Sequence, residues 1–181
     1  NEIPANKIDD DRNGYVDDVR GWDFTGPDND PMDPLGHGTH VAGIIGAVGN
    51  NNKGVVGVGW NTKIVPLKVG TEKAPNVASA AEAILYAVKM KIPILNMSFA
   101  TPHFSRILYE VIKEANKAGI LIVASTNNKN SDDDVKPYYP ANYDLPNIIS
   151  VMAVSRENNT KSYSNFGKNS IDLGAPGEEI V

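Results

Sequence analysis

The pattern of apolar and polar positions changes sharply near residue 37. Residues 1–36 are polar and contain turn-forming pairs such as Asn13-Gly14 and Gly26-Pro27, which predict loops. Beyond them, apolar segments of two lengths alternate along the chain. The longer segments predict helices, and the shorter, continuously apolar ones predict strands of a sheet that is covered on both faces.

Three segments have helical length or periodicity, namely residues 37–48, 77–90 and 105–118. Four shorter apolar segments predict strands, namely residues 64–69, 92–99, 120–125 and 148–154. Alternating strands and helices are typical of an α/β fold, in which a parallel sheet is flanked by helices on both faces. The first helix consists of small and apolar residues, and we expect it to be buried.

Ligands of such sheets bind beyond the carboxyl ends of the strands. The segments that leave two of these ends, residues 98–101 and 126–130, are polar and irregular. We therefore expect the functional site at these two segments.

Composition narrows the classes of function. A chain of 181 residues with 41% hydrophobic residues suits one compact domain or a large part of one. The net charge of -5 disfavours a nucleic-acid partner, because phosphate binding needs a basic face. The absence of cysteine excludes disulfides and thiolate metal sites, and no apolar run is long enough to span a bilayer. No signal peptide is present, but the chain begins with Asn1, as expected of an excised or processed segment. Nothing indicates an oligomeric state.

Nine aspartates fall within the first 33 residues. The spacing Asp9-x-Asp11-x-Asn13-Gly14-x-x-Asp17 resembles the first part of a calcium loop, in which alternating oxygen ligands wrap a hard cation. It is not a complete EF-hand, because Arg20 stands where the closing glutamate belongs. The candidate Ca²⁺ ligands of this insertion, at about residues 8–20, are Asp9, Asp11, Asn13, Tyr15, Asp17 and Asp18. A solvated acidic turn is the alternative.

His37 stands at the start of the first predicted helix, followed by Gly38, Thr39 and His40. Small residues there let other backbone approach the ring closely, and a helix start disfavours imidazolium and helps to keep a base neutral. Taken alone, the motif allows three interpretations: a hydrogen-bonded structural histidine, a metal pair with His40, or a catalytic base.

The motif belongs to a longer pattern. The run from Gly36 to Ile44 resembles the histidine motif of the subtilisin-like serine proteases. Five later segments resemble landmarks of the same family in the same order, namely residues 51–58 (a calcium loop), 94–99 (the central strand), 119–124 (the strand leading to the oxyanion asparagine), 139–141 and 175–177. This resemblance covers nearly the whole chain. It implies a three-layer subtilisin-like fold, with residues 1–181 as part of one catalytic domain.

The resemblance implies cleavage of peptide bonds by acyl transfer, in which a serine attacks, a histidine takes its proton and an aspartate orients the histidine. It implies that His37 is the catalytic histidine, that His40 is a core residue and that Asn128 is the side-chain oxyanion donor. Asn127 stands where the family has glycine, which leaves open which asparagine donates. Residues 1–181 contain neither the aspartate motif Asp-Ser/Thr-Gly nor the serine motif Gly-Thr-Ser, so the chain by itself is expected to be inactive.

The resemblance also implies that a peptide or protein substrate binds as an added strand between residues 73–76 and 98–100. The primary pocket would be walled by Ser98, Phe99, Ala100, Ser125 and Thr126. Pro75 lies in a segment that is normally glycine-rich, and Ala100 and Thr101 replace glycines of the family. These departures indicate either family drift or, alternatively, a narrowed groove or a relative that has lost protease activity.

A second Ca²⁺ site is implied by the family's calcium loop. Its ligands would be the side chains of Asp23 and Asn51 and the backbone oxygens of Gly49, Lys53 and Val55. The family further implies a cis Tyr139-Pro140 bond and a secreted protein, extracellular or at the cell surface. The leading hypothesis is thus a calcium-stabilised endopeptidase, and the alternatives are a non-catalytic, peptide-binding relative and a calcium-binding structural module.

Overall fold

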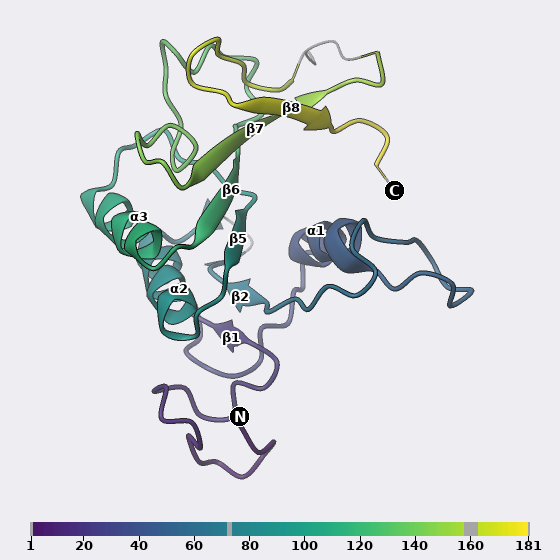
Figure 1. The fold of residues 1–181 in the computed structure, drawn as a ribbon, viewed down its shortest axis with the longest axis vertical. Coiled ribbons are helices and arrows are strands. Elements are labelled where there is room, and N and C mark those ends of the chain that lie inside the picture. The colour runs from purple at the N-terminus through teal and green to yellow at the C-terminus, as the bar shows by residue number, and fades with distance from the viewer. Residues whose placement is uncertain (1, 72–73, 158–162, 181) are drawn as a thin grey trace. The chain divides into compact units, whose positions relative to one another are not determined.

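The computed structural model describes residues 2–71, 74–157 and 163–180, which form two compact units. The first unit extends to Ala83 and the second covers residues 84–180. Helix α2 (Val77–Lys89) spans the boundary between them. Figure 1 labels the elements in chain order.

The first unit contains two short strand pairs. β1 (Trp22–Asp23) pairs in parallel with β2 (Leu67–Lys68), and β3 (Gly70–Thr71) pairs antiparallel with β4 (Ala74–Pro75). The strand predicted at residues 64–69 is thus reduced to two residues. Pro66 explains the reduction, because it has no N–H to donate, although its carbonyl accepts the N–H of Trp22 at 3.1 Å.

The expectation that the first helix is buried is wrong. α1 (His37–Gly46) has no buried residue, and His40 is exposed rather than part of a core. The helix is held mainly at its C-terminal end, where the N–H groups of residues 57, 58 and 59 donate to the carbonyls of residues 47, 44 and 45. A Cβ at Gly57 would lie 2.4 Å from the nitrogen of Ala47, so only glycine permits this approach. Within the described part of the first unit, α1 therefore keeps its apolar side chains largely accessible.

The second unit is built on a four-stranded parallel sheet (Figure 1). Its strands follow sequence order and are β5 (Ile94–Met97), β6 (Leu121–Ser125), β7 (Ile148–Val154) and β8 (Leu173–Pro176). α3 (Arg106–Lys117) connects β5 to β6 and fully buries Leu108, Ile112 and Ala115. Ser105 begins this helix by accepting the N–H of Leu108 at 3.3 Å.

The prediction of a parallel α/β fold is confirmed. Burial alternates along β6, where Ile122 and Ala124 are buried and their neighbours are half-buried. One face of this sheet is therefore covered more deeply than the other, although the strand sequence is continuously apolar. None of the helices in the described residues combines the length and apolar composition that a bilayer crossing requires.

Candidate functional site

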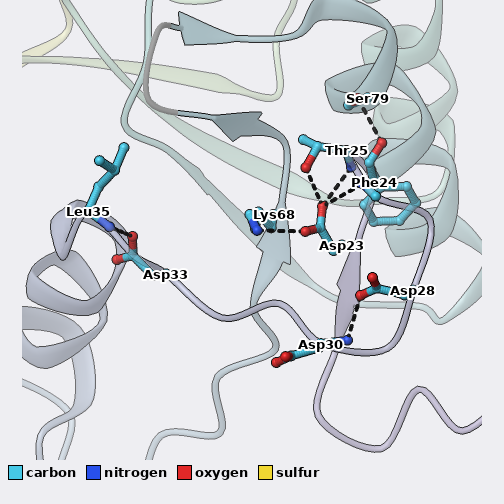
Figure 2. Close-up of polar contacts among 10 residues, drawn as sticks. Asp23, Phe24, Thr25, Asp28, Asp30, Asp33, Leu35, Lys68 and Ser79 are labelled. Carbon is cyan, nitrogen blue, oxygen red and sulfur yellow. Dashed lines mark hydrogen bonds and ion pairs between the residues drawn. The ribbon is translucent and has the colours of Figure 1, made fainter.

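The backbone around His37 is organised by Asp33. One carboxylate oxygen of Asp33 accepts the N–H groups of Leu35 and Gly36, both at 3.0 Å, and the other accepts the N–H of Thr39 at 2.8 Å and its hydroxyl at 3.0 Å. Figure 2 shows the bond to Leu35 beside the start of α1. One carboxylate thus holds the chain on both sides of His37, whose own side chain is exposed.

Asp33 remains charged at neutral pH. The hydrogen bond from the Thr39 backbone lowers the pKa of its carboxyl most, and this outweighs the opposite effect of burial. A negative charge is favourable at the N-terminus of a helix. The sequence analysis did not select Asp33, because it lies three residues before the N-cap residue, Gly36, and its spacing matches no capping pattern.

Asp23, which was predicted to bind calcium, already has a cationic partner. Its carboxylate lies 2.6 Å from the ammonium of Lys68 and accepts the N–H and hydroxyl of Thr25, both at 2.6 Å (Figure 2). Burial raises the pKa of Asp23, but the hydrogen bonds from Lys68, Thr25 and Gly26 outweigh it and bring the pKa down to about 2. A calcium ion at this carboxylate would have to displace an ammonium group.

The other residues of the second predicted calcium site lie in the loop after α1. The side-chain oxygen of Asn51 accepts the N–H of Lys53 at 2.9 Å. Gly49 lies against the ring of Trp60, where an added Cβ would come within 2.8 Å, and Val55 is exposed. These contacts do not test the ligand set, which stays a prediction.

Two predicted ligands of the first calcium site lie close together, and a third carboxylate, which the sequence analysis did not select, lies beside them. Carboxylate oxygens of Glu2, Asp9 and Asp11 all lie within 4.8 Å of one another. Asp9 and Asp11 also each accept the N–H of Asn13, at 2.9 and 3.0 Å, which turns the chain between them. Glu2 precedes the acidic repeat, so no spacing marked it.

The remaining acidic residues of the loop have other partners. The buried carboxylate of Asp17 accepts the N–H groups of Asn6 and Lys7 at 3.1 and 2.9 Å. The buried carboxylate of Asp18 accepts the side-chain amide of Asn13 at 2.8 Å. These carboxylates fold the loop back on itself.

Tyr15 anchors the same loop to β1. Its N–H donates to the side-chain oxygen of Asn13 at 2.7 Å. Its ring packs edge-on against Trp22 and Phe24, with centroid distances of 5.0 and 5.8 Å. The predicted role of Tyr15 as a metal ligand is not tested by these contacts.

In the second unit, the segments that follow β5 and β6 leave the same edge of the sheet, because the two strands are adjacent and parallel. The predicted pocket residues lie in these segments and at the last residue of β6, namely Ser98, Phe99, Ala100, Ser125 and Thr126, of which only Thr126 is buried. A third segment joins them, because Thr101 and Tyr139 exchange two backbone hydrogen bonds of 2.8 and 2.9 Å. The cis peptide at Tyr139-Pro140 is confirmed. In the segment predicted to form the other side of the groove, Lys73 lies outside the described residues.

The two candidate oxyanion residues differ in exposure. Asn127 is half-buried, and its side-chain oxygen accepts the N–H of Asn128 at 2.7 Å. Asn128 is exposed, so it is the more accessible of the two. His37 belongs to the first unit and both asparagines to the second. The assignment of Asn128 as the donor stays a prediction.

Known proteins of one family are similar to this chain over most of its length. The sequence model of the Peptidase_S8 or subtilase family matches residues 4–180. Subtilisin-like protease 2 of Plasmodium falciparum (isolate 3D7) is 36% identical over 155 residues, which cover 83% of this chain and 12% of that protein. The thermophilic serine proteinase of Bacillus sp. (strain AK1) is 34% identical over 165 residues, which cover 90% of this chain and 39% of that protein. The chain thus spans well under half the length of either relative.

Solved structures agree with these matches. The crystal structure of a cold adapted subtilisin-like serine proteinase superimposes with a TM-score of 0.75 at 28% identity, covering 88% of this chain and 55% of that one. A lanthipeptide protease superimposes with a TM-score of 0.73 at 26% identity, covering 87% of this chain and 47% of that one.

Proposed function

The chain belongs to the subtilase family, and on this premise we propose that it is part of the catalytic domain of a secreted, calcium-stabilised serine endopeptidase. The observation that carries the proposal is the motif around His37, which begins α1 with its backbone held on both sides by Asp33. The family match over residues 4–180 favours a catalytic role for this histidine over a structural one.

In this role His37 takes the proton of a serine hydroxyl as that oxygen attacks the substrate carbonyl, and later gives it to the leaving amine. The exposed ring is accessible to such a partner. Because residues 1–181 contain neither the aspartate motif nor the serine motif of the family, the proposal requires a longer protein that supplies both groups.

We infer that the peptide substrate binds at the carboxyl ends of β5 and β6. Residues 98–100 leave β5, the first strand of the sheet, and present backbone groups to which an extended peptide can hydrogen-bond. Ser125 and Thr126 leave the adjacent strand and would form the other wall of the primary pocket. The side-chain amide of Asn128 or Asn127 follows on the same segment and would donate to the oxyanion.

We also propose that calcium binds at Glu2, Asp9 and Asp11. The oxygens of these three carboxylates lie within 4.8 Å of one another, and oxygen is the ligand that calcium prefers. Bound calcium would stabilise this loop and take no part in the chemistry. Secretion fits this proposal, because extracellular modules bind calcium at about 10⁻⁴–10⁻³ M.

One observation favours a non-catalytic relative that binds peptides. Ala100 and Thr101 add side chains where the family has glycines, and Thr101 is already paired with Tyr139. These side chains would narrow the space in which a substrate carbonyl must approach the oxyanion donor.

The proposal is tested by incubating the longer protein with a fluorogenic peptide and with a fluorophosphonate probe, which labels activated serines. Hydrolysis of the peptide and labelling of one serine would support it. Binding of the peptide without hydrolysis or labelling would favour the non-catalytic relative. If the protein neither binds nor cleaves peptides, the proposal is wrong.

A further inference from the structure

A fully buried asparagine holds the segment that follows β6. Asn165 is 0% exposed, and its N–H donates to the carbonyl of Asn127 at 2.7 Å. Its side-chain oxygen accepts the N–H groups of Lys129 at 2.8 Å and Ser131 at 3.3 Å. Its carbonyl lies 3.5 Å from the hydroxyl of Thr126. One residue thus contacts four positions of the segment from Thr126 to Ser131.

Asp133 determines which way the Asn165 amide points. One carboxylate oxygen of Asp133, which is 1% exposed, accepts the Asn165 side-chain N–H at 2.8 Å. An amide has donors on one side and an acceptor on the other. A reversed amide would place its NH₂ group against the N–H groups of Lys129 and Ser131, and its oxygen against a carboxylate. The carboxylate therefore selects the orientation that holds the segment.

The backbone reinforces this arrangement. The N–H of Asp133 donates to the carbonyl of Phe166 at 2.7 Å, and the N–H of Phe166 donates to the carbonyl of Ser131 at 3.0 Å. Asn142 donates its side-chain amide to the carbonyl of Asp133 at 3.3 Å. The pair of Asp133 and Asn165 thus has a fixed place beneath a segment whose residues 128–130 are exposed.

We propose that Asn165, oriented by Asp133, is a positioning residue that fixes residues 126–131 and so aims the oxyanion donor, Asn128 or Asn127, at the substrate. This inference rests on the proposed function. Oxyanion donors accelerate acyl transfer only when they are held in place before the charge develops. An exposed polar segment has many conformations of similar energy, and the bonds to Asn165 select one of them. Asn165 itself does not touch the substrate.

The experiment compares two buried asparagines of the same unit in the longer protease. Asn165→Ala removes the bonds to the segment. Asn147→Ala is the matched control, because Asn147 is 7% exposed and donates to the carbonyl of Ile120 at 3.0 Å, at the opposite end of β6. Peptide hydrolysis gives kcat and KM, and hydrogen exchange followed by mass spectrometry reports on the backbone of residues 126–131.

Asn165→Ala is expected to lower kcat by about 10–100-fold with little change in KM, because a displacement of about 1 Å costs rate on this scale. It is also expected to speed exchange in residues 126–131. Asn147→Ala is expected to leave both readouts unchanged. A fall in kcat that is equal in the two variants, or unchanged exchange of the segment in Asn165→Ala, would overturn the inference.

A second pair of variants leaves Asn165 in place. Asp133→Asn keeps an acceptor for the Asn165 amide, so its kcat is expected to stay close to that of the wild type. Asp133→Leu removes the acceptor, so its kcat is expected to fall as in Asn165→Ala. Equal kcat in these two variants would also overturn the inference. A wild-type protein without peptidase activity would refute the proposed function, whereas an active wild type with unchanged kcat in Asn165→Ala would refute only the positioning role.

Discussion

Replacing Asp133 with asparagine removes a buried titratable group at nearly constant size. Burial, together with the negative charges of Asp132 and Asp134, raises the pKa of Asp133 to about 6, although the hydrogen bond from Asn165 lowers it. The second carboxylate oxygen of Asp133 is buried without a hydrogen-bond partner in the described residues, which agrees with this direction.

The size of the effect follows from the pKa difference between the folded and unfolded states. An aspartate in an unfolded chain titrates near pH ~3.9, so folding favours the neutral form of Asp133. The stability that this preference contributes is complete below about pH 4 and is lost as the pH rises through about 6. The whole loss is on the order of 3 kcal/mol, of which about 2 kcal/mol falls between pH ~4.5 and ~7.5.

Urea unfolding of the wild type and of Asp133→Asn at these two pH values measures how the free energy of unfolding of each protein depends on pH. The free energy of unfolding of the variant, minus that of the wild type, is expected to rise by about 2 kcal/mol from the lower pH to the higher. Other titratable groups are shared and largely cancel in the difference. A difference that does not change with pH would refute the raised pKa.

Asp134→Asn is the matched control, because the pKa of Asp134 is lowered, whereas that of Asp133 is raised. Hydrogen bonds from Ser170 and Asn169 lower the pKa of Asp134, so its stabilising contribution is present at neutral pH and is lost on acidification. This loss begins only below the pH at which an unfolded aspartate titrates, ~3.9, so for Asp134→Asn the same difference in unfolding free energy is expected to stay nearly constant between pH ~4.5 and ~7.5. A rise in both variants would show that the change does not come from the individual carboxyls.

Lys68→Met is expected to lower the free energy of unfolding by about 2 kcal/mol at neutral pH, because it leaves the buried carboxylate of Asp23 without its cation. Urea unfolding measures this change, with Lys63→Met as the control at an exposed lysine. Equal effects of the two substitutions would contradict the prediction. Calcium at millimolar concentration is expected to raise the Tm of the wild type, and to raise that of Asp9→Asn by less, as measured by scanning calorimetry. An equal rise in both proteins would argue against a calcium site at Glu2, Asp9 and Asp11. Residues 1–181 on their own are expected to leave casein uncleaved, with or without calcium, because they lack the serine and aspartate motifs. Cleavage that persists through purification would show that these residues contain a catalytic nucleophile.

The sequence predicted elements best where local patterns decide them. α3 begins and ends within one residue of the expected helix, because its periodicity and its serine cap are both local signals. β7 matches the expected strand from Ile148 to Val154. β8 was missed, because its four residues, Leu173–Pro176, include a glycine and a proline and form no apolar run.

Contacts between residues that are far apart in the sequence could not be predicted from it. Asn165 contacts Lys129 and Asp133 across more than 30 residues of sequence, and no local pattern marks such a pairing. The accessible surface of α1 is a second case, because a small apolar helix predicts burial only if another element covers it. The motif around His37 was recognisable because residues 36–44 are contiguous, whereas the contribution of Asp33 needed the coordinates.

The central claim is that His37 is the general base of a serine endopeptidase, and one measurement tests it most directly. The longer protein and its His37→Ala and His103→Ala variants are assayed for kcat/KM on a fluorogenic peptide. His103 is the control, because it is exposed and lies outside the motif. The account predicts a loss on the order of 10⁶-fold for His37→Ala, the scale measured when the triad histidine of subtilisin is removed, and no loss for His103→Ala. Wild-type activity that survives in His37→Ala would contradict it.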